Sequence, residues 1–100
     1  MYRFMRTATV RNAASLPAAA QFAGEVTAHV NKRHGIAMRF GIESYGKSRV
    51  HWHFDIDSLD KMQQLNRSLM EDREYFGLLE KYKEVWVDGS VKDRLVVFPD

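Results

Sequence analysis

The residues best suited to chemistry gather in one short segment. Apolar and polar residues alternate there, so one face of an extended strand would carry His51, His53 and Asp55. Imidazoles about 6.5–7 Å apart and beside a carboxylate can transfer protons near neutral pH. With Glu43 or Asp55 as a third ligand they could also bind a divalent metal. Because such pairs are common without an ion, the sequence favours acid–base chemistry and predicts no resident metal.

The strand that carries these residues is expected to pair with the segment before it. Residues 36–45 and 48–56 alternate in the same way around the turn Tyr45-Gly46-Lys47-Ser48, which predicts a hairpin. Two registers keep the apolar residues on one face. The favoured register places Arg39 opposite Asp55 and Glu43 opposite His51, whereas the other places Arg39 opposite His53 and Glu43 opposite Arg49. The first is preferred because it gives Asp55 a cation.

The polar face of this hairpin makes up the predicted site. The residues assigned to proton transfer are His51, His53, Glu43 and Asp55. The residues assigned to ligand binding are Arg39, Tyr45, Arg49 and Gly41. The arginines would hold an anionic or enolate-like oxygen, the tyrosine would donate a hydrogen bond, and the glycine would leave room for a ligand. Alternatively, the same charges pair across a subunit interface and only specify the assembly.

The elements that must position this face follow from the hydrophobic periodicity. It predicts strands over 2–10, 36–45, 48–56 and 91–98, a helix over 17–34, and a second helix from Asp57-Ser58 that continues past a bend at 71–74. Pro17 suits a first helical turn, and Gly35 suits a left-handed helix cap. The order predicts one ferredoxin-like α+β domain over residues 1–100, with both helices on one face of a four-stranded antiparallel sheet.

The last strand indicates a partner of the same kind. Leu95, Val96, Val97 and Phe98 are apolar in a row, so both faces of the sheet should be covered at this point. One pair of helices covers only one face. The simplest cover for the other is a second copy of the chain, and we therefore expect a homodimer with sheet facing sheet.

Half of the chain resembles a known group, the dimeric α+β barrel superfamily, and most of all its NIPSNAP-like branch. The matching features are Trp52 and Asp55, then Asp72-Arg73-Glu74-Tyr75, then Gly89-Ser90-Val91-Lys92-Asp93. The resemblance implies a dimer whose sheets enclose a cleft. Members of that superfamily include cofactor-independent oxygenases of aromatic polyketides, lactone isomerases, haem-degrading enzymes and many proteins with no known activity. The Asn/Trp/His set of the haem-degrading branch has no clear counterpart, and alternation puts Trp52 on the apolar face.

Composition excludes several classes of function. The chain has no cysteine, which excludes disulfide scaffolds, zinc ribbons and thiol nucleophiles. A net charge of +2 gives no reason to expect a nucleic-acid partner, and no apolar run approaches the roughly 18 residues of a membrane helix. Charges near the start argue against a signal peptide, so we expect a cytoplasmic protein. No phosphate loop or dinucleotide motif is present, and no cofactor is predicted.

Two further histidines receive a structural interpretation. His29 and His34 lie on or just after the first helix, beside Lys32 and Arg33, where the helix dipole favours cations.

The leading functional hypothesis is a cleft between sheets that binds or transforms a small, partly apolar molecule by proton transfer or cofactor-independent oxygenation. The alternative is a non-enzymatic assembly module whose polar sheet face forms only the dimer interface.

Overall fold

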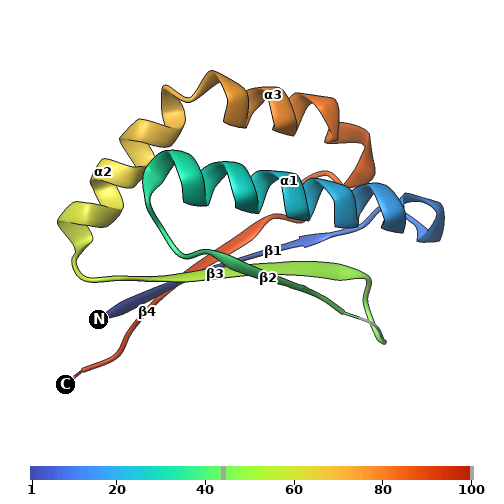
Figure 1. Ribbon diagram of the computed structural model, residues 1–100. Helices are drawn as coiled ribbons and strands as arrows, with labels where there is room; N and C mark the ends of the chain where they lie inside the picture. The colour runs from blue at the N-terminus through green and yellow to red at the C-terminus, as the bar shows by residue number, and fades with distance from the viewer. Residues whose placement is uncertain (44, 100) are drawn as a thin grey trace.

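Residues 1–43 and 45–99, which the computed structural model describes, form one antiparallel sheet with helices on one of its faces (Figure 1). The strands are β1 (Tyr2–Thr9), β2 (Arg39–Ile42), β3 (Arg49–Ile56) and β4 (Lys92–Val97). The helices are α1 (Leu16–His34), α2 (Leu59–Met70) and α3 (Arg73–Lys81), with short 3-10 turns η1 (Ala13–Ser15) and η2 (Lys83–Val85). The strand order is β2-β3-β1-β4. The predicted ferredoxin-like fold is confirmed, and the predicted second helix is divided into two.

The register of the hairpin differs from the favoured prediction. Arg39 lies opposite His53 and Gly41 opposite His51, which is the register that was considered and not preferred. The reason is that Asp55 obtains its cation from another strand. Arg3 of β1 lies opposite Asp55 and donates to it from Nε at 2.8 Å and from Nη2 at 3.3 Å. Asp55 therefore needs no ion pair with Arg39.

The predicted strand over 36–45 is shorter in the structure. The side chain of Asn31 in α1 forms hydrogen bonds with the backbone of Met38, which would otherwise pair within the sheet. Asn31 of α1 donates to the carbonyl of Met38 at 3.0 Å and accepts from the Met38 N–H at 2.7 Å. The sheet therefore begins only at Arg39. Before that, Gly35 closes α1 in the left-handed conformation that was predicted. At the other end of the predicted strand, Ser44 lies outside the described residues.

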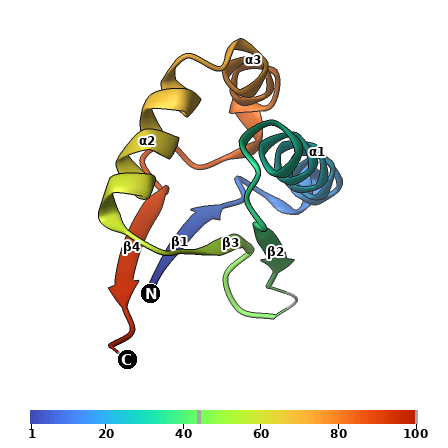
Figure 2. The ribbon, with the colours of Figure 1, turned by 60° about the vertical axis from the view of Figure 1, so that its left-hand side comes forward.

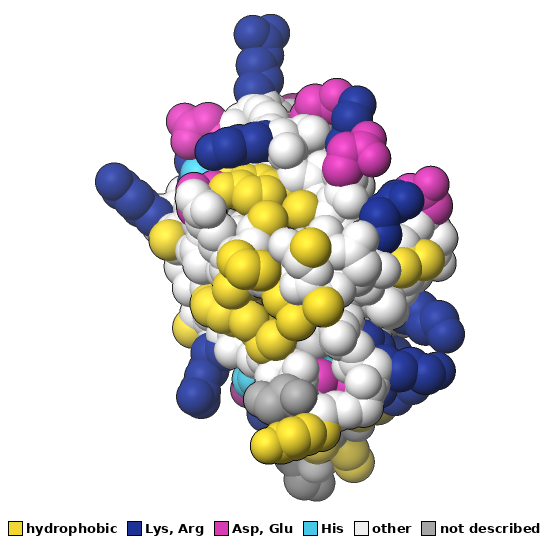
Figure 3. Space-filling view, turned by 90° about the vertical axis from the view of Figure 1, so that its right-hand side faces the viewer, with side chains coloured by type: hydrophobic (Ala, Val, Ile, Leu, Met, Phe, Trp, Pro, Cys, Tyr) yellow, Lys and Arg dark blue, Asp and Glu magenta, His cyan; other side chains and the backbone are white. Residues whose placement is uncertain are grey.

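The core fills the space between the sheet and the helices (Figure 2). Along β3 the residues Val50, Trp52 and Phe54 are buried and point toward the helices, as the alternation predicts. The ring of Phe22 on α1 meets Trp52 at a centroid distance of 6.0 Å and Trp86 at 5.5 Å. Hydrophobic side chains also reach the surface at the end of the molecule where α1 begins and α3 ends, among charged ones (Figure 3). The edge strands β2 and β4 also keep exposed hydrophobic residues, so the helical layer covers the middle of the sheet better than its margins.

The helical layer changes direction after Met70. Ser58 caps α2 by accepting from the N–H of Lys61, and Asp72 caps α3 by accepting from the N–H of Tyr75. Both residue types are strong helix N-caps. The polar stretch that predicted a bend is therefore a true helix end followed by a new helix start, and it carries a buried carboxylate.

Candidate functional site

A cavity of about 130 Å³ lies between the helices and the sheet. Its wall is mostly apolar and comes from every layer of the domain. It is lined by Phe4, Arg6, Ala8, Phe22, Val26, Val30, Ile36, Met38, Trp52, Phe54, Met62, Leu65, Asn66, Leu69, Tyr75, Leu79, Trp86 and Val91. This cavity lies on the face of the sheet opposite to the predicted site.

One charged side chain belongs to this wall. Arg6 of β1 alternates with Phe4 and Ala8 and so faces the helices. Its guanidinium donates to Asp93 of β4 through Nε at 2.7 Å and Nη2 at 2.9 Å, and its Nη1 lies 3.2 Å from the hydroxyl of Tyr75. The hydrogen bonds to Asp93 raise the pKa of Arg6 above its ordinary value, against the effect of burial. Arg6 is therefore a fixed positive charge at the edge of an apolar space.

A second polar group in the wall lacks a partner. The indole Nε1 of Trp52 is buried, and no described residue accepts a hydrogen bond from it. A buried N–H without a partner costs about 1–3 kcal/mol. This N–H is itself inaccessible to a water-sized molecule. Arg6 and Tyr75 together could hold a molecule that is mainly apolar and carries one or two oxygen atoms.

The residues predicted to form the site lie on the other face of the sheet and divide into two groups. Glu43 Oε1 lies 2.7 Å from Nε2 of His51 and accepts from Nε of Arg49 at 2.8 Å. The contact with His51, more than that with Arg49, holds the pKa of Glu43 below its ordinary value. The pair Glu43–His51 therefore forms, although Glu43 is opposite Arg49 in the register.

The second group forms around Asp55. The hydrogen bonds that Arg3 donates to Asp55 lower the pKa of this carboxylate. The sequence pattern had not indicated Arg3 as its partner. His53 and Arg39 face one another across β2 and β3. Tyr45 is 95% exposed in the turn after β2 and joins neither group. Gly41 stands beside His51 rather than His53. Within one chain these residues form a polar surface.

Sequence reasoning did not find the cavity, although one signal was available. Arg6 is a charged residue at a strand position whose neighbours on the same face are apolar. Such a position requires a buried partner, and Asp93 lies directly opposite in β4. The sequence pattern could not predict that the N–H of Trp52 lacks a partner, because this group becomes buried only when the helices pack over the sheet.

Comparison with known proteins places this geometry among solved structures. No protein-family model matches the chain, and no curated protein matches it. A structure described as an uncharacterized NIPSNAP domain protein from Burkholderia xenovorans is 14% identical over 100% of both chains, with a TM-score of 0.78. A NIPSNAP family protein of unknown function from Agrobacterium tumefaciens is 18% identical over 96% of this chain and 86% of its own, with a TM-score of 0.78.

SnoaB, a cofactor-independent oxygenase from Streptomyces nogalater solved as a mutant, is 9% identical over 99% of this chain and 93% of its own, with a TM-score of 0.70. The chain has the ferredoxin-like fold of these proteins. Its resemblance to NIPSNAP structures agrees with the sequence features from Trp52 to Asp93. Among the described residues, none of the helices is both long and apolar enough to cross a membrane.

Proposed function

We propose that this NIPSNAP-like chain binds a small molecule with a single aromatic ring and an oxygen acceptor in the cavity between helices and sheet. The observation that carries the proposal is the combination of an apolar space of about 130 Å³ with one charged side chain, Arg6, in its wall. An engineered apolar cavity of about 150 Å³ in another protein binds benzene, so one ring is the right size here.

Arg6 supplies preference for a ligand with partial negative charge on oxygen. A guanidinium has five N–H groups, and the contacts with Asp93 and Tyr75 use three of its nitrogens once each. The remaining N–H groups are free to meet a phenolate, an enolate or a carbonyl oxygen. Those N–H groups could donate hydrogen bonds to an oxygen anion formed beside Arg6.

The test uses the two tryptophans, which are the only ones in the chain and both line the cavity. Their fluorescence is recorded while p-cresol or toluene is added. Both should saturate the signal, with p-cresol binding more tightly because its hydroxyl can meet polar groups of the wall. Arg6→Met should reduce the preference for p-cresol, whereas Arg3→Met, the same change on the opposite face of β1, should not. Absence of saturation by either compound at millimolar concentration would exclude the proposal.

A second candidate is cofactor-independent oxygenation in the same cavity. It is favoured by a charged group, Arg6, that could stabilise the anion of an oxidisable ring. In that reaction a ring-attached CH₂ loses two hydrogens and gains one oxygen atom from O₂, and the other oxygen atom leaves as water. Oxygen uptake above the protein-free rate, lost in Arg6→Met, would support it. An unchanged rate with a compound that is shown to bind would leave binding alone.

We also propose that two copies pair through the sheet face that carries His51 and His53. All helices of the described chain lie on the opposite face (Figure 2). Val96 of β4 and Phe98 just after it come to this face, where Arg3 lies over the Phe98 ring, and Leu95 and Val97 on the other side remain 42% and 57% exposed. Charges of both signs alternate here, so two such faces could complement each other. Native mass spectrometry at micromolar concentration should give twice the chain mass, and a monomer would contradict the pairing.

A further inference from the structure

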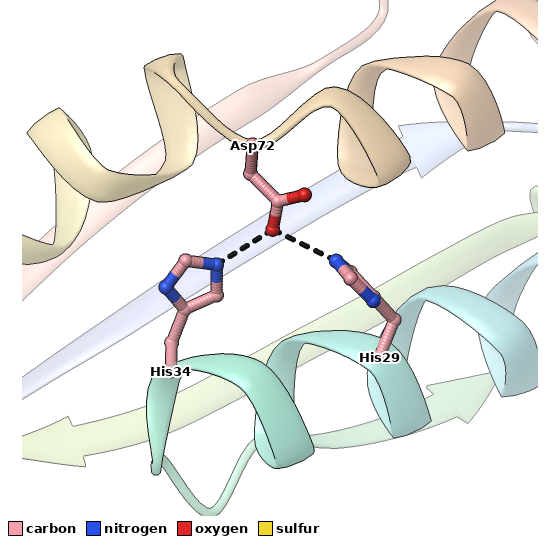
Figure 4. Close-up of side chains that lie close together, drawn as sticks. All are labelled: His29, His34 and Asp72. Carbon is pink, nitrogen blue, oxygen red and sulfur yellow. Dashed lines mark hydrogen bonds and ion pairs between the residues drawn. The ribbon is translucent and has the colours of Figure 1, made fainter.

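Two histidines and an aspartate converge away from the cavity and away from the polar sheet face (Figure 4). His29 and His34 extend from α1, and Asp72 extends from the junction between α2 and α3. Nε2 of His29 lies 2.8 Å, and Nε2 of His34 lies 2.7 Å, from the same Oδ2 atom of Asp72. The candidate ligand atoms of the three residues all lie within 4.8 Å of one another.

The three side chains are held in place by their surroundings. The side chain of Asp72 is 3% exposed, that of His34 is 7% exposed, and that of His29 is 14% exposed. The second carboxylate oxygen of Asp72 accepts the backbone N–H of Tyr75 at 3.0 Å, which fixes the orientation of the group. The two imidazole rings stand at 86° to one another. The two Nε2 atoms therefore approach the same oxygen of Asp72 from different directions.

The cluster also has an outer carboxylate of the kind found at metal sites. A neutral imidazole has one N–H, and its other nitrogen carries a lone pair. A second carboxylate, that of Glu74, lies 3.2 Å from Nδ1 of His29. A carboxylate behind a ligating histidine is a common outer partner at metal sites.

We propose that His29, His34 and Asp72 bind a divalent transition-metal ion, with Zn²⁺ as the expected occupant. Two imidazoles and one carboxylate form a donor set that suits zinc and related ions. Tetrahedral ligands at zinc bond lengths of about 2.0–2.1 Å are about 3.3 Å apart. The Asp72–histidine distances of 2.7 and 2.8 Å need to open by about half an ångström, and the widest separation in the cluster, which is within 4.8 Å, needs to close. Three protein ligands leave a fourth position for water or another small ligand.

The proposal is tested with Zn²⁺ and Co²⁺ added to the chelator-treated protein. Calorimetry should give one Zn²⁺ per chain, and the thermal midpoint should rise with Zn²⁺. In His29→Gln and His34→Gln, the Zn²⁺ affinity should fall at least tenfold. Asp72→Asn should do the same while keeping a good helix cap. The matched control is His51→Gln, because His51 also lies 2.7 Å from a carboxylate and yet is outside the cluster.

A measurement on the unmodified chain avoids any question of whether the variants fold. The chain has four histidines, and two of them lie outside the cluster. Paramagnetic Co²⁺ should broaden the imidazole signals of His29 and His34 first and leave those of His51 and His53 sharp until higher concentration. Broadening of His51 and His53 first, or a lack of stoichiometric binding at 100 µM metal, would show that the cluster is only hydrogen-bonded and overturn the proposal.

Discussion

Filling the cavity from the sheet side should stabilise the fold and weaken ligand binding together. Ala8 is buried in β1 and lines the cavity, and Ala8→Val adds two methyl groups there. Two buried methyl groups at about 0.8 kcal/mol each set an upper limit of about 1.6 kcal/mol. Allowing for some strain, we expect a gain of about 1 kcal/mol.

The assays are urea unfolding and thermal unfolding, both followed by tryptophan fluorescence, with a parallel titration of p-cresol. The gain should raise the thermal midpoint by about 4–8 °C in a domain of this size and weaken p-cresol binding at least tenfold. Ala8→Thr is the matched control, because threonine has nearly the shape and strand preference of valine but brings a hydroxyl into an apolar wall. It should be less stable than Ala8→Val by about 1–2 kcal/mol. A loss of stability in Ala8→Val, or a gain with unchanged p-cresol affinity, would refute the reasoning.

Three further predictions concern other parts of the fold. In the presence of chelator, Asp72→Ala should lower the free energy of unfolding by about 3–5 kcal/mol, measured by urea unfolding, because it removes a buried carboxylate that makes three hydrogen bonds. Asp72→Asn should recover about 1 kcal/mol because it keeps the helix cap, and equal losses in the two variants would contradict the capping role. The pKa of Glu43 is lowered mainly by His51, so Glu43 should stabilise the fold above its ordinary pKa of 4.5 and lose that effect as the pH falls through its lower folded value; a carboxyl NMR titration should show a midpoint below 4.5 that rises in His51→Gln. Gly24→Ala should stabilise α1 by about 1 kcal/mol, since a Cβ there meets nothing within 4 Å, whereas Gly35→Ala should cost about 1 kcal/mol because its φ is 66°; thermal unfolding of both variants checks the opposite signs.

Local patterns predicted the elements because each signal acts within a few residues. The alternation in β3, the capping glycine after α1 and the capping residues before α2 all depend on near neighbours. The register depended on a distant residue, because the cation that Asp55 requires is Arg3. The cluster around Asp72 could not be predicted for the same reason, since its histidines are 38 and 43 residues away. In the local sequence Asp72 suits a helix N-cap, and it does cap α3.

The polar face of the hairpin could be predicted from the sequence, but its function could not. The alternation correctly grouped His51, His53 and Asp55 on one face, and the structure adds the contact between Glu43 and His51. Whether such a face does chemistry depends on what encloses it, and one chain supplies no cover there. The cavity, in contrast, is enclosed by side chains from both layers of the domain, and only the packed fold brings them together.

Tyr75 connects the two regions that this structure singles out. Its backbone N–H holds the carboxylate of Asp72, and its hydroxyl lies against Arg6 in the cavity wall. A shift of α3 that adjusts one contact must be accommodated at the other, because both belong to one residue in the first turn of that helix. Occupancy at the histidine cluster and in the cavity would then be thermodynamically linked. If an ion changes the affinity for a ring compound by some factor, the ring compound must change the affinity for the ion by the same factor.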